Sequence, residues 1–340
     1  MAPLTRYRGN SKHTPTDLAV EHYAARASVP GTLLISEATF IAPKASGESF
    51  HVPGIWSDEQ VVAWKKVLLI SATLASTCIF ERFLMSKVTD AVHAKGSFMY
   101  LQLWALGRAA SVEKLKQEDP SFEYVSAGDV PLPRTPEQEQ KGEDAPRPRP
   151  LSKAEIAEYV QLYATAARDA VERAGFDGVE IHGANGYLLD QFLKETSNNR
   201  ADEFGGSPEN NSRFVLDVVA AVSAAVGEER VGLRLSPWLS LLGTRIVVLQ
   251  NPPADPPARQ ITPGTTRYLC SAILSRSYGD ATRTLGTSTS LNHASKAYLT
   301  ASLIGSRTTS CGPFGLANCG SPQEGSRGTA QSSKPMSRES

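Results

Sequence analysis

The chain has 340 residues, 41% of them hydrophobic, which is enough for one large α/β domain or two smaller ones. Lys/Arg and Asp/Glu number 35 each, and the resulting net charge of zero excludes a global attraction to nucleic acid or to membranes. The longest apolar run, residues 68–80, is too short to span a bilayer. Four cysteines without metal or redox spacing, and no signal peptide, predict a reduced, cytoplasmic protein that uses no metal.

Strand-like and helix-like segments alternate along the first two thirds of the chain. Apolar runs predict strands at residues 1–6, 31–39, 97–104, 176–181 and 231–235. Amphipathic segments predict three helices, which begin after Ser57, after Ser152 and at residue 208. This alternation is typical of a parallel sheet or a (β/α) barrel. Residues 105–150 form a long polar loop that is either functional or disordered.

The stretch 177–214 is the most informative, because an apolar strand there ends in His182 and is followed by Asn185 and Tyr187. Barrel enzymes keep their chemistry at such carboxyl ends of strands. One interpretation is structural. His182 then has its hydrogen bonds within the protein, Asn185 is a turn residue and the ring of Tyr187 packs against other side chains. In the other, His182 and Asn185 bind a substrate oxygen that gains negative charge, and Tyr187 protonates the neighbouring carbon.

Polar residues also lie in or after other predicted strands. Arg234 in VGLRLSP and Gln102 in YLQLW need partners if they are buried. These partners are either protein groups or an electron-rich ring at the mouth of a barrel, into which Thr5 can also aim its hydroxyl. Glu37 is either catalytic or paired with a neighbouring arginine.

Several segments together resemble one known family. They are MAPLTR (1–6), GTLLISEATFIAPKA (31–45), PGIWSDEQ (53–60), HAKGSFMYLQLW (93–104), HGANGYLLDQFL (182–193), DEFGGSPEN (202–210) and VGLRLSP (231–237). On these segments the chain resembles the old yellow enzymes, which are FMN-dependent NADPH dehydrogenases and ene-reductases with a (β/α)8 TIM barrel. The resemblance covers residues 1–66 and 88–238, and it is strongest to fungal members, including those of secondary metabolism.

The resemblance implies a role for each matching residue. Thr5, Ala38, Gln102 and Arg234 would contact the flavin, and Arg234 would stabilise its reduced form. His182 and Asn185 would bind the oxygen of an enone or a phenolic ligand, and Tyr187 would protonate its α-carbon. The implied cofactor is FMN, the implied reductant is NADPH, and the implied partner is a small molecule rather than nucleic acid or a membrane.

Two regions depart from the family pattern. Residues 67–87 interrupt a helix, and deleting them would join WKK to VTDAVHAKG, so we predict a retained intron there. Residues 239–340 are rich in Ser, Thr, Gly and Pro, and among residues 241–340 ten are Lys/Arg against four Asp/Glu. This composition is typical of disordered sequence or of a coding sequence read out of frame.

The predicted barrel is therefore incomplete, since strands 6–8 are not recognisable after residue 238, and we predict weak or absent FMN binding. Three alternatives remain from the sequence. One is a defective, non-enzymatic product without a stable fold. Another is a different TIM-barrel enzyme, although no Schiff-base lysine or metal-ligand pattern is visible. The third, a nucleic-acid module in the basic tail, is disfavoured because its charges are scattered and lack aromatic partners.

Overall fold

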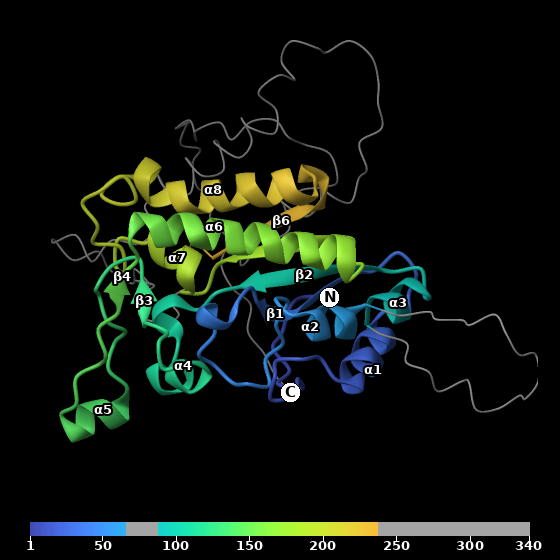
Figure 1. Ribbon diagram of the computed structural model, residues 1–340, viewed down its shortest axis with the longest axis horizontal. Helices are drawn as coiled ribbons and strands as arrows, with labels where there is room; N and C mark the ends of the chain where they lie inside the picture. Colours follow the sequence, from blue (N-terminus) through green and yellow to red (C-terminus); the bar gives the residue numbers. More distant parts are fainter. Residues whose placement is uncertain (66–87, 237–340) are drawn as a thin grey trace, which may run out of the picture. The chain divides into compact units, whose positions relative to one another are not determined.

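A parallel sheet of four strands forms the centre of the computed structural model, which describes residues 1–65 and 88–236 (Figure 1). The strands lie in the order β1, β2, β5 and β6, with bounds Leu33–Phe40, Phe98–Trp104, Gly178–Gly183 and Val231–Leu235. Their order in the sheet follows their order in the chain, as expected when helical crossovers join successive parallel strands. The strands predicted from residue 31 onward are therefore confirmed.

The register of this sheet brings residues from all four strands to one edge. Ala38 lies opposite Gln102, and Gln102 lies opposite Glu180. His182 lies opposite Arg234 on the last pair of strands. An irregularity in β1 just before Ala38 adds a residue to that strand and re-aims its end.

Helices connect the strands, and capping serines set where several of them begin. The helices are α1 (Asp17–Arg26), α2 (Asp58–Trp64), α3 (Val88–His93), α6 (Lys153–Arg168), α7 (Leu188–Leu193) and α8 (Pro208–Val226). Ser57, Ser152 and Ser207 each accept a hydrogen bond from the backbone N–H three residues on. The three predicted helices are therefore confirmed. α6 continues as a π-helical turn, Asp169–Arg173, and α6 and α8 lie alongside each other (Figure 1).

Two hydrophobic clusters hold the described part of the chain together. In the larger one, strand residues such as Leu101 and Ile181 pack with helix residues such as Tyr163 and Phe214, and all four are fully buried. The smaller cluster gathers residues from the ends of β1 and β2 and the loops that follow them, namely Ala38, Phe40, Val52, Trp104, Leu106 and Ala110, with Tyr187 packed against it. This second cluster forms one wall of the candidate site.

Residues 105–150 are not a single irregular loop, so the prediction for this segment is wrong in detail. They contain η3 (Gly107–Ala109), α4 (Val112–Glu118), β3 (Val125–Ser126), α5 (Pro136–Lys141) and β4 (Arg149–Pro150), and β3 pairs with β4 in parallel. Ser111 and Thr135 cap α4 and α5. These short elements depend on local capping, which an analysis of apolar periodicity does not detect.

The predicted strand end at residues 1–6 is reduced to edge contacts with β1. The Met1 amino group donates to the carbonyl O of Leu33 at 2.7 Å, and Ile35 N donates to the carbonyl O of Met1 at 3.0 Å. The chain then turns at Tyr7, whose φ of 54° lies in the left-handed region. Short 3-10 turns, η1 (Pro43–Ala45) and η5 (Glu228–Arg230), complete the described elements.

α2 and α3 meet although residues 66–87 separate them in the chain. The Oγ1 of Thr89 in α3 lies 3.1 Å from the carbonyl O of Trp64, the last residue of α2. The same hydroxyl lies 2.9 Å from the carbonyl O of Ala174. The predicted insertion at 67–87 and the predicted tail at 239–340 lie outside the described residues.

Candidate active site

Aromatic side chains gather where β1, β2 and β5 end. Trp104 stacks on Phe40 with ring centroids 5.0 Å apart. Tyr187 meets Trp104 and His182 edge-on, with centroid distances of 4.8 Å and 5.0 Å. The sequence identified His182 and Tyr187 but not Trp104 or Phe40. Trp104 ends one predicted strand and Phe40 directly follows another, and an aromatic residue at such a position is equally typical of a core.

His182 is buried and electrically neutral. Burial, followed by the nearby Arg234 guanidinium, lowers its pKa to about 3. Its Nδ1 is also buried and has no hydrogen-bond partner within the described ranges. A neutral imidazole donates from one ring nitrogen and accepts at the other, so this Nδ1 is available to bond a ligand atom.

The turn that carries Asn185 and Tyr187 has an unusual backbone. Asn185 and Gly186 have φ values of 62° and 82°, in the left-handed region that glycine and asparagine tolerate best. Asn185 N donates to Ser236 Oγ at 2.7 Å, which ties the turn to the residue after β6. Gly186 N donates to Asp190 Oδ2 at 2.7 Å. These two bonds fix the direction in which Asn185 and Tyr187 leave the strand.

A buried ion pair on α7 supports the same turn. Lys194 Nζ lies 2.6 Å from Asp190 Oδ2, and the two side chains are 4% and 0% exposed. Burial raises the pKa of Asp190, and Lys194 opposes that shift. Gln191 Nε2 lies 2.8 Å from the carbonyl O of Gly186 and 2.9 Å from that of Leu106. Asp190 and Gln191 therefore hold the turn from its N–H and its C=O side, a role that the sequence did not reveal.

Tyr187 is half-buried and stays protonated at neutral pH. Burial raises its pKa most, followed by the negative charge of Glu48, while Arg234 acts in the opposite direction. A protonated tyrosine hydroxyl at the end of a strand can donate a proton to a bound molecule.

Gln102 and Arg234 occupy the expected strand positions with different surroundings. Gln102 is buried, and its Nε2 donates to Glu180 Oε1 at 2.6 Å, so the protein satisfies one end of this amide. Arg234 is half-buried rather than buried. Its guanidinium makes no ion pair with residues 1–65 or 88–236. The described residues therefore do not support the interpretation of Arg234 as half of a structural ion pair.

Thr5 and Ala38 complete the predicted set. Ala38 is 5% exposed and lies beside Gln102 in the sheet register. Thr5 is half-buried on the segment that contacts β1, and its hydroxyl has no hydrogen-bond partner in the part of the chain that the structure describes. The sheet thus brings Ala38, Gln102, His182 and Arg234 to one edge, and Thr5 lies on the segment that Met1 joins to β1.

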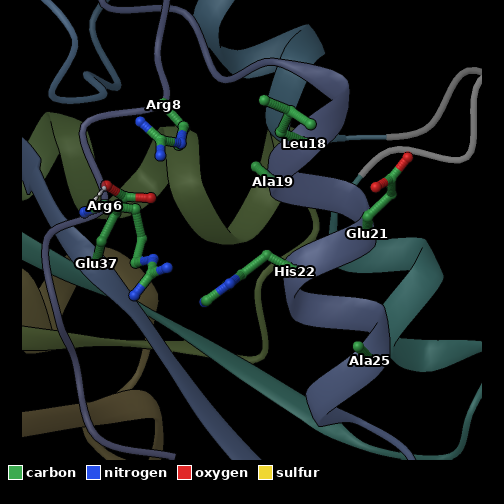
Figure 2. Close-up of a pocket in the computed structure, with 8 residues that line it drawn as sticks. All are labelled: Arg6, Arg8, Leu18, Ala19, Glu21, His22, Ala25 and Glu37. Atoms are coloured by element: carbon green, nitrogen blue, oxygen red, sulfur yellow. Dashed lines mark hydrogen bonds between the residues drawn. The ribbon is translucent and has the colours of Figure 1, made fainter.

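A separate open cavity of about 430 Å³ lies between the N-terminal segment and α1 (Figure 2). Arg6, Arg8 and Glu37 line one side of it, and His22 projects into it from α1. Glu37 accepts a hydrogen bond from the backbone N of Arg6 at 2.9 Å, so the expected pairing with an arginine uses the main chain. Burial raises the pKa of Glu37 to about 7. No other predicted site residue lines this cavity.

Residues 1–65 and 88–236 contain no group of three or more His, Cys, Asp and Glu side chains placed to hold a metal ion. Among the described helices, none is long and apolar enough to cross a membrane. The cytoplasmic location stays a prediction.

The family model described as the NADH:flavin oxidoreductase / NADH oxidase family matches residues 1–70 and 83–246. The chain belongs to this family. The unmatched residues 71–82 lie within the predicted insertion at 67–87, whose origin as an intron stays a prediction. The match continues to residue 246, so the predicted end of the resemblance at residue 238 is too early.

Fungal members of the family are similar over most of this chain. It is 46% identical over 246 residues to the NADP-dependent oxidoreductase lnbE of Aspergillus flavus, which is 72% of this chain and 56% of that protein. Identity to the chanoclavine-I aldehyde reductase fgaOx3 of Penicillium roqueforti is also 46% over 246 residues, which is 72% of this chain and 58% of that protein. The "probable inactive dehydrogenase easA" of Claviceps fusiformis is 45% identical over 243 residues, covering 72% and 55%. The chain therefore spans little more than half the length of these relatives.

Solved structures of old yellow enzymes share the fold. The enzyme from Pichia sp. AKU4542 superposes with a TM-score of 0.66 at 33% identity, covering 82% of this chain and 64% of that one. The homologue from Zymomonas mobilis gives a TM-score of 0.58 at 38% identity, covering 72% and 60%. The fold class is therefore that of the old yellow enzymes, a TIM barrel, and the four described strands are consecutive strands of such a barrel.

The family is one of FMN-dependent oxidoreductases, and the edge residues fit a flavin ring. One edge of that ring alternates oxygen and nitrogen atoms, which need several hydrogen-bond donors close together. The guanidinium of Arg234 and the hydroxyl of Thr5 are such donors without partners in the described ranges, and Ala38 at the same edge of the sheet is small. The unpartnered Nδ1 of His182 lies at the same edge of the sheet. A substrate that binds next to the flavin would need such a group there.

Proposed function

We propose that this chain carries the flavin-ring and substrate sites of an FMN-dependent NADPH oxidoreductase. The reaction is reduction of the activated C=C bond of an α,β-unsaturated carbonyl compound in secondary metabolism. The similar fungal proteins named as an NADP-dependent oxidoreductase and as an aldehyde reductase support this choice.

The observation that carries the proposal is the pairing of His182 with Tyr187. His182 is neutral and buried, its Nδ1 lacks a partner among the described residues, and the protonated Tyr187 ring lies 5.0 Å away. His182 and Asn185 donate hydrogen bonds to the carbonyl oxygen and stabilise the negative charge that develops on it. Tyr187 then delivers a proton to the α-carbon.

Thr5, Ala38, Gln102 and Arg234 hold the flavin ring in this proposal. When bound, FMN supplies the hydride that reaches the β-carbon. The positive charge of Arg234 favours electron density on the ring edge next to it, and the same charge helps to keep His182 neutral. The wall formed by Phe40 and Trp104 excludes water from the carbonyl group and strengthens its hydrogen bonds.

The test uses the full chain with saturating FMN, NADPH and 2-cyclohexen-1-one. It measures the formation of cyclohexanone, the saturated ketone that reduction of the C=C bond produces. We expect turnover that Tyr187→Phe lowers by about 100-fold or more. The matched control is Tyr100→Phe, which removes a hydroxyl from the opposite end of the sheet and should leave the rate unchanged. Equal rates for Tyr187→Phe and the unaltered chain would exclude Tyr187 as the proton donor.

A second candidate is a flavin-binding protein without reductase activity. It is favoured by the similarity to the proteins named "probable inactive" from Claviceps and Epichloe, at 43–45% identity. The same assay separates the two, because this candidate binds FMN and a phenolic ligand but leaves the enone unreduced.

A further inference from the structure

Glu37 is a buried carboxylate of β1 to which the proposed reaction gives no role. It precedes Ala38 at the irregularity of the strand and is 3% exposed. Its side chain lies in the wall of the cavity between the N-terminal segment and α1, beside Arg6 (Figure 2). Burying a carboxylate costs free energy unless its oxygens accept hydrogen bonds. The hydrogen bonds of Glu37 therefore indicate what this residue does.

The main chain of Glu37 is held on both sides. Its N–H donates to the Oη of Tyr23 in α1 at 2.7 Å, and Tyr23 is fully buried. The Oγ of Ser36 donates to the carbonyl O of Glu37 at 2.8 Å and accepts a hydrogen bond from Gln102 N in β2 at 3.0 Å. The side chain of Glu37 therefore extends from a fixed point of the backbone.

The carboxylate of Glu37 attaches the N-terminal segment to β1. Its Oε2 accepts a hydrogen bond from Arg6 N at 2.9 Å. Met1 makes the other attachment, at the start of β1. In the part of the chain that the structure describes, every hydrogen bond that joins residues 2–8 to β1 ends on the Glu37 side chain. Thr5 therefore lies between two points of attachment, and Glu37 provides the nearer one.

This hydrogen bond restricts the direction of the Thr5 side chain. The N–H of Arg6 belongs to the same rigid peptide plane as the carbonyl group of Thr5. A bond to that N–H therefore restricts rotation about the Cα–C bond of Thr5. Threonine is β-branched and stiff at χ1, so the direction of its hydroxyl follows from the backbone. The chain then turns at Tyr7, whose φ is 54°, so the attachment comes just before the turn.

The reach of the Glu37 side chain matters more here than its charge. The guanidinium of Arg6 makes no ion pair with a described residue, although it lies in the same cavity wall. Burial raises the pKa of Glu37 to about 7, while the hydrogen bond from Arg6 N acts in the opposite direction, so the charge is poorly compensated. The carboxylate supplies an acceptor oxygen within reach of Arg6 N, and an amide of the same length supplies one too.

We propose that Glu37 is a positioning residue, which orients the hydroxyl of Thr5 toward the flavin ring by holding the Thr5–Arg6 peptide. This inference rests on the proposed function, which assigns that hydroxyl to the ring. Glu37 acts through Thr5, because its own side chain lies in the cavity wall that faces α1 (Figure 2).

The experiment measures dissociation constants of riboflavin with the full chain, by quenching of flavin fluorescence. Glu37→Asp keeps the charge but shortens the side chain, and we expect it to weaken binding about three- to tenfold, as loss of one hydrogen bond does. Glu37→Gln loses the charge but keeps the reach, and it should bind within about twofold of the unaltered chain. Glu21→Asp is the matched control, because it shortens an exposed carboxylate on the α1 side of the same cavity and should leave binding unchanged.

A double-mutant cycle identifies the route by which Glu37 acts. Thr5→Ala should weaken riboflavin binding about three- to tenfold. Adding Glu37→Asp to Thr5→Ala should weaken it by less than about twofold more, because the hydroxyl that Glu37 orients is already gone. A purely structural role of Glu37 would persist without that hydroxyl, so additive losses would overturn the inference.

The remaining outcomes separate the positioning role from the flavin site. Unchanged binding by Glu37→Asp, or equal losses in Glu37→Asp and Glu37→Gln, would refute the role. Loss of cooperative urea unfolding in Glu37→Asp would also refute it, since Glu37 would then serve the stability of the fold. If Thr5→Ala binds riboflavin as well as the unaltered chain does, the flavin site stands and only the roles of Thr5 and Glu37 fail. If the unaltered chain binds neither riboflavin nor FMN, the proposed function fails, and the positioning role fails with it.

Discussion

His182 shows how one residue's surroundings decide its chemistry. Its position after an apolar strand is visible in the sequence, but the same position suits a structural histidine equally well. The structure adds a buried Nδ1 that lacks a described partner and a pKa lowered to about 3. These surroundings distinguish a neutral histidine with a free ring nitrogen from one that is charged or already hydrogen-bonded, as the proposed role of His182 requires.

This depressed pKa makes a prediction about stability and pH. In the unfolded chain His182 takes up a proton near its ordinary pKa of 6.5, whereas in the folded protein it resists protonation until about pH 3. The unfolded state therefore binds more protons between these values, and stability falls as the pH is lowered through this window. When the pH falls from 7 to 4.5, the free energy of unfolding of the unaltered chain decreases. We expect this decrease to be roughly 2 kcal/mol smaller in His182→Gln, which lacks the titrating group.

Urea unfolding at the two pH values measures this difference. The matched control is His51→Gln, since His51 contacts only a backbone carbonyl and its surroundings do not bury it. Parallel losses in the unaltered chain and in His182→Gln would show that His182 is not the buried neutral group described.

The sequence identified polar site residues, because polar residues are rare at the end of an apolar strand. It missed the residues that pack against these polar residues and support them. His182, Asn185, Tyr187, Gln102 and Arg234 are polar residues next to apolar strands, so their positions stand out. The site's Trp104 has no such contrast, because an aromatic ending a buried strand reads as core.

At the level of elements, α7 is more than a connection after β5. Its Asp190 carboxylate accepts the Gly186 N–H and pairs with Lys194, all away from solvent. An Asp and a Lys four residues apart inside LLDQFLK are a visible sequence signal, but the same spacing is common on exposed helix faces. Burial alone distinguishes the two situations, and the sequence does not report it.

Breaking this pair should be costly. Asp190→Ala leaves Lys194 buried without its partner and removes the acceptor of Gly186 N–H, so we expect a loss of about 3 kcal/mol or more in urea unfolding. The double variant Asp190→Asn with Lys194→Met keeps an acceptor and leaves no buried charge, so its loss should be smaller. A double variant as unstable as Asp190→Ala would contradict the account of this ion pair.

The junction of α2 and α3 makes the second prediction at this scale. The hydroxyl of Thr89 lies 3.1 Å from the carbonyl O of Trp64, so the ends of the two helices already lie together. Deleting residues 67–87 joins these ends into one helix, as the sequence pattern suggests. We expect the deletion variant to unfold cooperatively with a melting temperature at least equal to that of the full chain. A lower melting temperature or loss of cooperativity would contradict the insertion hypothesis.

The existence and order of strands and long helices were largely predictable because apolar runs and capping residues are local signals. Ser57 and Ser152, for example, mark the starts of α2 and α6 and form capping boxes in the structure. The elements within 105–150 were not predictable in this way, because they are short and lack an apolar face. The edge segment at residues 1–6 likewise reads as a strand but makes only two backbone bonds to β1.

For the molecule as a whole, the structure describes four consecutive strands of an old yellow enzyme barrel, and these strands bring Ala38, Gln102, His182 and Arg234, the proposed flavin and substrate residues, to one edge. The family model matches the chain as far as residue 246, and the sequence after that residue lies outside the match. Flavin binding by this chain is therefore expected to depend on the ring rather than on the phosphate.

Titration of the full chain with FMN and with riboflavin, followed by quenching of flavin fluorescence, tests this central claim most directly. We predict saturable but weak binding of both flavins, with dissociation constants within about threefold of each other. Arg234→Gln should weaken both to the same extent, because its guanidinium contacts the shared ring. No saturable binding of either flavin, or binding that Arg234→Gln leaves unchanged, would contradict the assignment of the strand ends as a flavin site.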